Sequence, residues 1–124
     1  MKKLIIFFLV SIFALTACSS GANYETIDID DIPQKVDEGY QVLDVRETPE
    51  YDEGHIPGAI NKPLSELKTG DTEGLDSNQK YIVICQSGNR SKEASTILTE
   101  EGFTILNVSE GMSSWTGDIE KGWF

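Results

Sequence analysis

Six consecutive residues combine the side chains best suited to chemistry in this sequence: Cys85, Gln86, Ser87, Gly88, Asn89 and Arg90. They follow the apolar run 81–84, which is typical of a strand. A strand followed by a polar turn and a helix places the cysteine at the carboxyl end of the sheet, where open α/β folds bind ligands. Backbone N–H groups of such a turn point inward beside a helix N-terminus and favour the reactive thiolate. Gly88 permits the sharp turn, and Arg90 adds a positive fork. The pattern predicts a nucleophilic Cys85 in a loop suited to a small oxyanion or a charged sulfur species.

Strands and helices are predicted to alternate around this loop. The expected strands cover 24–29, 42–45, 59–60, 81–84 and 103–108. The expected helices are one capped by Asp30 or Asp31 and ending near Gly39, a short one opened by Pro63, and a longer one over 91–101. Residues 68–79 lack periodicity and are predicted to be loop. Alternation of this kind indicates an α/β fold, with a mainly parallel sheet flanked by helices on both faces.

The N-terminus has the features of an export signal. Two lysines precede the apolar run 4–15, which is too short for a bilayer that needs about 20 helical residues. Leu15-Thr16-Ala17-Cys18 resembles a bacterial lipoprotein cleavage box. The resemblance implies a signal peptide over 1–17, a lipidated Cys18 with a short tether over 18–23, and a domain over 24–124 anchored extracytoplasmically. The alternative is an uncleaved anchor in which Cys18 is incidental.

The net charge argues against some classes of function. Cleavage removes two of the 10 basic residues and none of the 21 acidic residues, so the net charge becomes −13. This balance argues against binding to nucleic acid or to anionic lipid, and solubility is its simplest explanation. The alternative explanation is that the acidic residues form a binding surface for a basic partner.

Lipidation of Cys18 would leave Cys85 as the single thiol, without a partner for an intramolecular disulfide. Its position in a polar loop favours a reactive residue over an inert buried one. One free cysteine and one histidine fall short of a zinc site, so neither a metal nor a cofactor is expected.

Several motifs resemble the single-domain rhodanese, or sulfurtransferase, family across about residues 25–122. They are Asp44-Val45-Arg46, the segment 53–61 (EGHIPGAIN), the loop 85–90, and Gly111-Met112 with Trp115. The resemblance implies the five-stranded rhodanese-like fold. It also implies ping-pong transfer, in which Cys85 takes the outer sulfur of a small anionic donor such as thiosulfate and passes it to cyanide or a thiol.

Within the resemblance, each motif residue has an expected role. Amide groups of the loop from Gln86 to Arg90 would stabilise the persulfide, and Arg90 would hold a sulfonate. Hydroxyl or amide groups of Ser87, Asn89 and Ser91 would contribute further contacts to the donor. Lys92 would do no more than attract the anionic donor toward the site. The segment with His55 and Gly58 is expected to be structural. Arg46 is expected to pair with Glu47, Glu50 or Glu53, and the buried Asp44 with backbone N–H groups.

Two other functions compete with sulfur transfer by turnover. Phosphatases and arsenate reductases also use a cysteine loop ending in arginine, but with five intervening residues where this chain has four. The shorter ring suits one extra sulfur better than phosphate. A membrane-tethered sulfur carrier or protein-binding module with little turnover stays open, as do the physiological donor, the acceptor, any protein partner and the oligomeric state.

Overall fold

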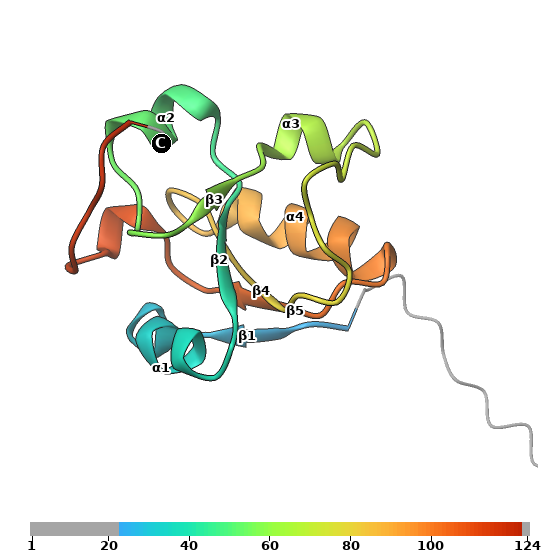
Figure 1. Ribbon diagram of the computed structural model, residues 1–124, viewed down its shortest axis with the longest axis horizontal. Coiled ribbons are helices and arrows are strands. Elements are labelled where there is room, and N and C mark those ends of the chain that lie inside the picture. The colour runs from blue at the N-terminus through green and yellow to red at the C-terminus, as the bar shows by residue number, and fades with distance from the viewer. Residues whose placement is uncertain (1–22, 123–124) are drawn as a thin grey trace, which may run out of the picture.

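The computed structural model describes residues 23–122, which form an α/β fold (Figure 1). The strands are β1 (Glu25–Ile27), β2 (Gln41–Asp44), β3 (Ile60–Asn61), β4 (Tyr81–Ile84) and β5 (Ile105–Val108). The helices are α1 (Ile32–Asp37), α2 (Thr48–Glu53), α3 (Leu64–Leu67) and α4 (Asn89–Glu100), with the 3-10 turns η1 (Ile29–Asp31) and η2 (Met112–Ser114). The predicted leader, Cys18 and most of the predicted tether lie outside the described residues.

All five strands form one parallel sheet in the order β1-β5-β4-β2-β3. The central strand β4 lies between β5 and β2, and each of its residues is buried. Because the strands are parallel, their carboxyl ends share one edge of the sheet, and Cys85 follows β4 at that edge. The predicted five-stranded sheet with helices is therefore confirmed.

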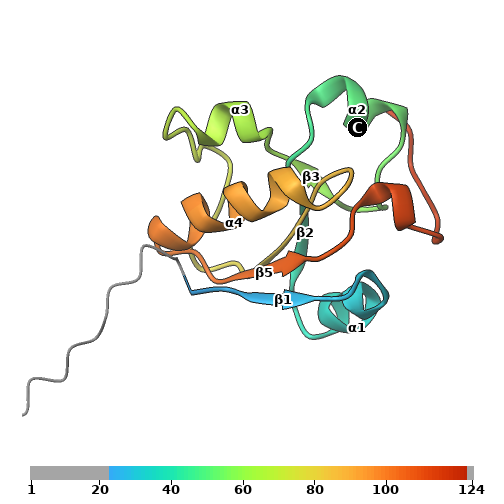
Figure 2. The same ribbon diagram turned by 180° about the vertical axis from the view of Figure 1, so that it is seen from behind.

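Alternating side chains of the strands build a hydrophobic core on each face of the sheet. Leu43 and Val83 face one core together with Leu98 of α4 and residues of α3. Ile82 faces the other core, where Ile32 of α1 packs. Figures 1 and 2 show α3 and α4 on one side of the sheet and α1 on the other.

Several element boundaries differ from the sequence predictions. Asp31 ends the turn η1 and occupies the N-cap position of α1, but it makes no side-chain capping hydrogen bond. The helix α4 begins at Asn89, two residues before the predicted start, because left-handed Gly88 lets the chain turn directly into it. The strand β3 is shifted by one residue from the prediction.

The short helix α2 is absent from the sequence predictions. This six-residue helix is too short to show the apolar periodicity from which helices are predicted. Reciprocal hydrogen bonds between Glu47 and Glu50 form a capping box at its start, and Pro49 lies in its first turn. Burial of Tyr51 then fixes it against the core.

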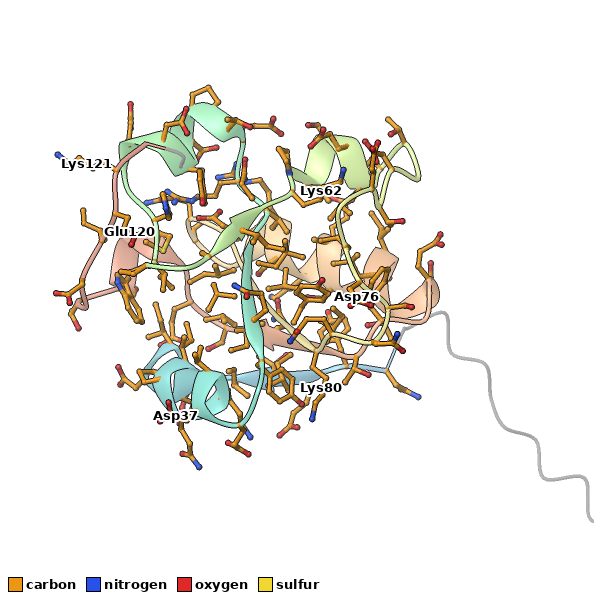
Figure 3. The ribbon with its side chains drawn as sticks, in the orientation of Figure 1. Asp37, Lys62, Asp76, Lys80, Glu120 and Lys121 are labelled. Carbon is orange, nitrogen blue, oxygen red and sulfur yellow. The ribbon has the colours of Figure 1, made fainter. Side chains whose placement is uncertain are left out.

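The predicted loop over 68–79 contains no helix or strand. An ion pair of 3.0 Å between Lys62 Nζ and Asp71 Oδ1 ties it to the segment after β3, and Figure 3 labels Lys62 there. Within residues 23–122, no helix combines the length and apolarity required to cross a bilayer.

Replacing Leu43 with alanine should lower the free energy of unfolding by about 2–5 kcal/mol, because the side chain is fully buried in the core that also contains Leu98 of α4. Urea unfolding followed by circular dichroism measures the change. Val36→Ala is the matched control, since Val36 is 45% exposed and should change stability little. Similar losses for both variants would contradict the proposed core.

Candidate active site

The Cys85 side chain is shielded from solvent at the end of β4, and its sulfur faces the following loop. The N–H of Gly88 donates to Cys85 Sγ at 3.1 Å. Burial by itself raises the pKa of this thiol. Hydrogen bonds from the Ser91 hydroxyl and from the N–H groups of Ser91, Ser87 and Gly88 outweigh that effect and lower the pKa below the ordinary cysteine value. The loop therefore stabilises a thiolate.

Two close backbone approaches fix the shape of this loop. Gly88 has φ +94°, and a Cβ there would collide with the carbonyl oxygen of Ser109. A Cβ on Gly111 would collide with the backbone of Gln86. The N–H of Met112 donates to Cys85 O at 2.8 Å, which holds the start of the loop in place. The cysteine loop thus packs against the segment after β5, and this contact holds the loop in its shape.

The other predicted loop residues have different environments. Ser87 and Asn89 are exposed at the rim, and Asn89 begins α4. Ser91 is buried in the first turn of α4, with its hydroxyl 3.2 Å from the carbonyl oxygen of Gly88. The Gln86 side chain accepts a hydrogen bond of 3.2 Å from Arg46 Nη1. Lys92 is exposed.

Arg90 forms a bidentate ion pair with Glu50 of α2. The distances are 2.6 Å from Nη1 to Oε1 and 2.8 Å from Nη2 to Oε2. The hydrogen bond from Arg90 is the main reason that the pKa of Glu50 lies below its usual value. The positive charge of Arg90 is therefore balanced by the carboxylate of Glu50.

Arg46 is ion-paired as expected, but the expected partners were wrong. Its guanidinium binds Asp44, with Nη2 at 2.7 Å from Oδ2 and Nε at 3.0 Å from Oδ1, and Nη2 also donates to Gly54 O at 2.7 Å. Both members of the pair are buried, and the N–H of Arg46 donates to Asp44 Oδ1. Mutual neutralisation is what permits two charges in this interior.

His55 lies in a structural network. Its ring stacks on Tyr51 at 3.7 Å between centroids, and Nδ1 lies 2.8 Å from Tyr51 O. Its Nε2 is 3.6 Å from Glu120, which Figure 3 labels on the C-terminal segment. Gly58 takes φ +81° in the turn closed by Ala59 N–H and Ile56 O. In the described part of the chain, no hydrogen bond joins His55 to the cysteine loop.

A cavity of about 350 Å³ lies beside the loop. Its lining combines charged, polar and apolar residues: Arg46, Glu50, Glu53, Gly54, Gln86, Met112, Trp115 and Ile119. Sequence reasoning did not identify Glu50 as the partner of Arg90, nor Ile119 as part of this lining. These two roles are visible only in the structure, where α2 and the C-terminal segment lie beside the cysteine loop.

Comparisons with known proteins agree with this geometry. The pattern of rhodanese-like domains matches residues 28–118. The "Putative sulfur carrier protein YrkF" of Bacillus subtilis is 41% identical over 97 residues, which are 76% of this chain and 52% of that protein. The "Putative sulfurtransferase YtwF" of Bacillus subtilis is 38% identical over 86 residues, which are 69% of this chain and 82% of YtwF.

A solved rhodanese-related protein from Thermoplasma volcanium superimposes with a TM-score of 0.71 at 37% identity. The match covers 78% of this chain and 98% of that protein. This chain thus spans nearly all of one solved relative but about half the length of YrkF.

Replacing Ser91 with alanine should raise the pKa of Cys85, because the thiolate loses the hydrogen bond of the hydroxyl. Ultraviolet absorbance of the thiolate, recorded against pH in a Cys18→Ser background, measures the shift, and Cys85→Ser supplies the blank. The unmodified loop should titrate at a lower pH than free cysteine. Ser87→Ala is the matched control, because that exposed hydroxyl is no donor to the sulfur. Equal titration curves for both variants would contradict the assignment.

Proposed function

This chain belongs to the rhodanese-like domain family, and on that premise we propose that it is a sulfurtransferase that carries a sulfane sulfur as a persulfide on Cys85. The position of the sulfur supports the proposal most directly. Cys85 Sγ accepts the Gly88 N–H at the end of β4, and the surrounding loop lowers the pKa of the thiol. The named relatives include a sulfur carrier and a sulfurtransferase, which agree with this chemistry.

In the first half-reaction, the Cys85 thiolate attacks the outer sulfur of a donor such as thiosulfate. The sulfur–sulfur bond of the donor breaks, its electron pair leaves with sulfite, and a new bond joins Cys85 to the transferred sulfur. In the second, cyanide attacks that outer sulfur. Thiocyanate leaves, and the electron pair of the broken bond restores the Cys85 thiolate. This is covalent catalysis in two steps that needs no metal, oxidant or reductant.

The loop supplies electrostatic stabilisation for these steps. The negative charge that the protein carries stays on sulfur, as the Cys85 thiolate or its persulfide. The Gly88 N–H donates to that sulfur, and the N–H groups of Ser87 and Ser91 also help to lower the pKa of the thiol. Gly88 and Gly111 keep those donors in place because the packing at both positions excludes a Cβ. The residues Gln86 to Arg90 form the rest of the sulfur-binding ring.

A sulfur carrier with slow turnover is the second candidate. The observation that favours it is the complete shielding of Cys85 from solvent, which limits direct access of a donor or acceptor to the sulfur. A carrier would hold its persulfide under the same loop and release it only to a suited acceptor.

The N-terminal sequence extends the proposal to location. Cleavage before Cys18 and lipidation of its sulfur would place the domain outside the cytoplasm on a tether that ends at residue 23. The acidic net charge fits a domain anchored by lipid rather than by attraction to anionic headgroups.

The purified full-length chain in detergent should convert thiosulfate and cyanide to thiocyanate, and Cys85→Ser should reduce the rate to that of buffer. Serine is nearly isosteric but cannot form a persulfide, so folding should change little. Colorimetric assay of thiocyanate measures turnover, and intact mass measures the gain of one sulfur atom. A mass gain without turnover would identify the carrier. Neither signal with thiosulfate or polysulfide would refute the proposal.

Replacing Cys18 with serine should abolish incorporation of a labelled fatty acid when the chain is expressed in a bacterium. The sulfur of Cys18 is the proposed acceptor of the diacylglyceryl group, and serine lacks it. Cys85→Ser is the matched control and should incorporate label as the unmodified chain does. Label retained in Cys18→Ser, or absent from the unmodified chain, would exclude the proposed anchor.

A further inference from the structure

Both guanidinium groups around the candidate site are already neutralised. Glu50 holds Arg90 through two hydrogen bonds of 2.6 and 2.8 Å, and Asp44 holds Arg46 at 2.7 Å. An incoming anion must therefore compete with a carboxylate that is already in contact. Such competition is unfavourable, because bidentate carboxylate–guanidinium pairs are among the strong charge-assisted contacts.

Glu50 remains negatively charged at neutral pH. The hydrogen bond from Arg90, opposed by partial burial, places the pKa of Glu50 below its usual value. Glu53 is exposed on the same rim of the cavity, and none of the described ion pairs includes it. The cavity lining thus contains two carboxylates, Glu50 and Glu53, and one guanidinium, Arg46, so the lining is net negative before the Cys85 thiolate is counted.

Another part of the cavity lining is apolar. Met112 and Trp115 are partly buried there, and Ile119 is 52% exposed. The cavity volume of about 350 Å³ is suited to a small molecule rather than to a folded partner. Gln86 lines the cavity and directly follows Cys85, so an occupant of the cavity lies next to the sulfur-bearing loop.

We infer that Glu50 is a specificity-determining residue, which makes the site select small acceptor thiols with a positive charge and a short apolar body over anionic thiols. The inference rests on the proposed function and names its acceptor class. Glu50 acts in two ways. It offsets the charge of Arg90, which leaves the cavity net negative and attractive to a cation, and its contact with Arg90 withholds the guanidinium from an anion.

The transfer itself balances without another reactant. The acceptor thiolate attacks the outer sulfur of the Cys85 persulfide. A sulfur–sulfur bond forms on the acceptor, the bond within the Cys85 persulfide breaks, and its electron pair restores the Cys85 thiolate. The released product is the acceptor persulfide.

Cysteamine and 3-mercaptopropionate test the inference, because these thiols have similar size and opposite charge. The full chain carrying Cys18→Ser, in which Cys85 is the remaining cysteine, is loaded with inorganic polysulfide and freed of excess reagent. Intact mass then follows the loss of the added sulfur at several concentrations of each thiol. Rates are compared per thiolate, so that the different acidity of the two thiols does not enter the ratio.

The loaded chain should react faster with cysteamine, and Glu50→Gln should reduce the ratio of the two rates by about fivefold, the effect of one partly exposed charge at contact distance. Glu101→Gln is the matched control: it removes one exposed charge at the end of α4, remote from the cavity lining, and should leave the ratio unchanged.

Three outcomes would overturn the role of Glu50: neither rate changes in Glu50→Gln, both rates rise by the same factor in Glu50→Gln, or the ratio shifts equally in Glu101→Gln. The first and third would exclude local charge selection. The second would show that the Glu50–Arg90 pair restricts access without regard to charge. Failure of the unmodified Cys85 to gain sulfur is a separate result, which would refute the proposed function instead.

Discussion

The candidate site depends on several backbone N–H groups converging on one buried sulfur. A buried thiolate is costly unless hydrogen bonds replace its hydration, and the loop after β4 provides them. The loop keeps this shape because it packs against the segment after β5, where Gly88 and Gly111 allow approaches that exclude a side chain. The order of strands is therefore part of the chemistry, since β4 and β5 must be neighbours for the two segments to meet.

Two ion pairs join the surrounding elements to this loop. Arg46 binds Asp44 at the end of β2 and also reaches Gly54 and Gln86, while Arg90 connects α4 to Glu50 of α2. Loss of one member would leave a charge without its partner, which is more costly than the absence of the whole pair. These pairs position α2 against the loop. They also occupy the guanidinium groups of Arg46 and Arg90, so stabilisation of charge at the sulfur falls to the Ser91 hydroxyl and the backbone N–H groups of the loop.

The strand before Cys85 was predictable, because its continuous apolar run is typical of a central parallel strand, and β4 matches the predicted range. The pair of Asp44 and Arg46 was missed because the glutamates that follow Arg46 were favoured as its partners, although residues two apart in extended chain lie on the same face. The contact of Glu50 with Arg90 was not predictable, because 40 residues separate them and α2 was unrecognised. Helix α2 is stabilised by its capping box and by burial of Tyr51, and a six-residue helix gives too little periodicity to detect.

The location of the charge during the reaction explains why transfer of one sulfur atom suits this loop better than phosphoryl chemistry. The chain has a formal net charge of −11, and both arginines near Cys85 are paired, so an approaching dianion, thiosulfate included, gains little from the long-range field or from a free guanidinium. Backbone dipoles act over a short range and stabilise charge already located at the end of β4. In persulfide transfer the negative charge that the protein carries stays on sulfur, within reach of the Gly88 N–H and its neighbours. A phosphoryl group would spread its charge over several oxygens and need more donors than four intervening residues provide. The loop is therefore matched to the transferred atom, and the cavity beside it is left to discriminate between the molecules that deliver or remove that atom.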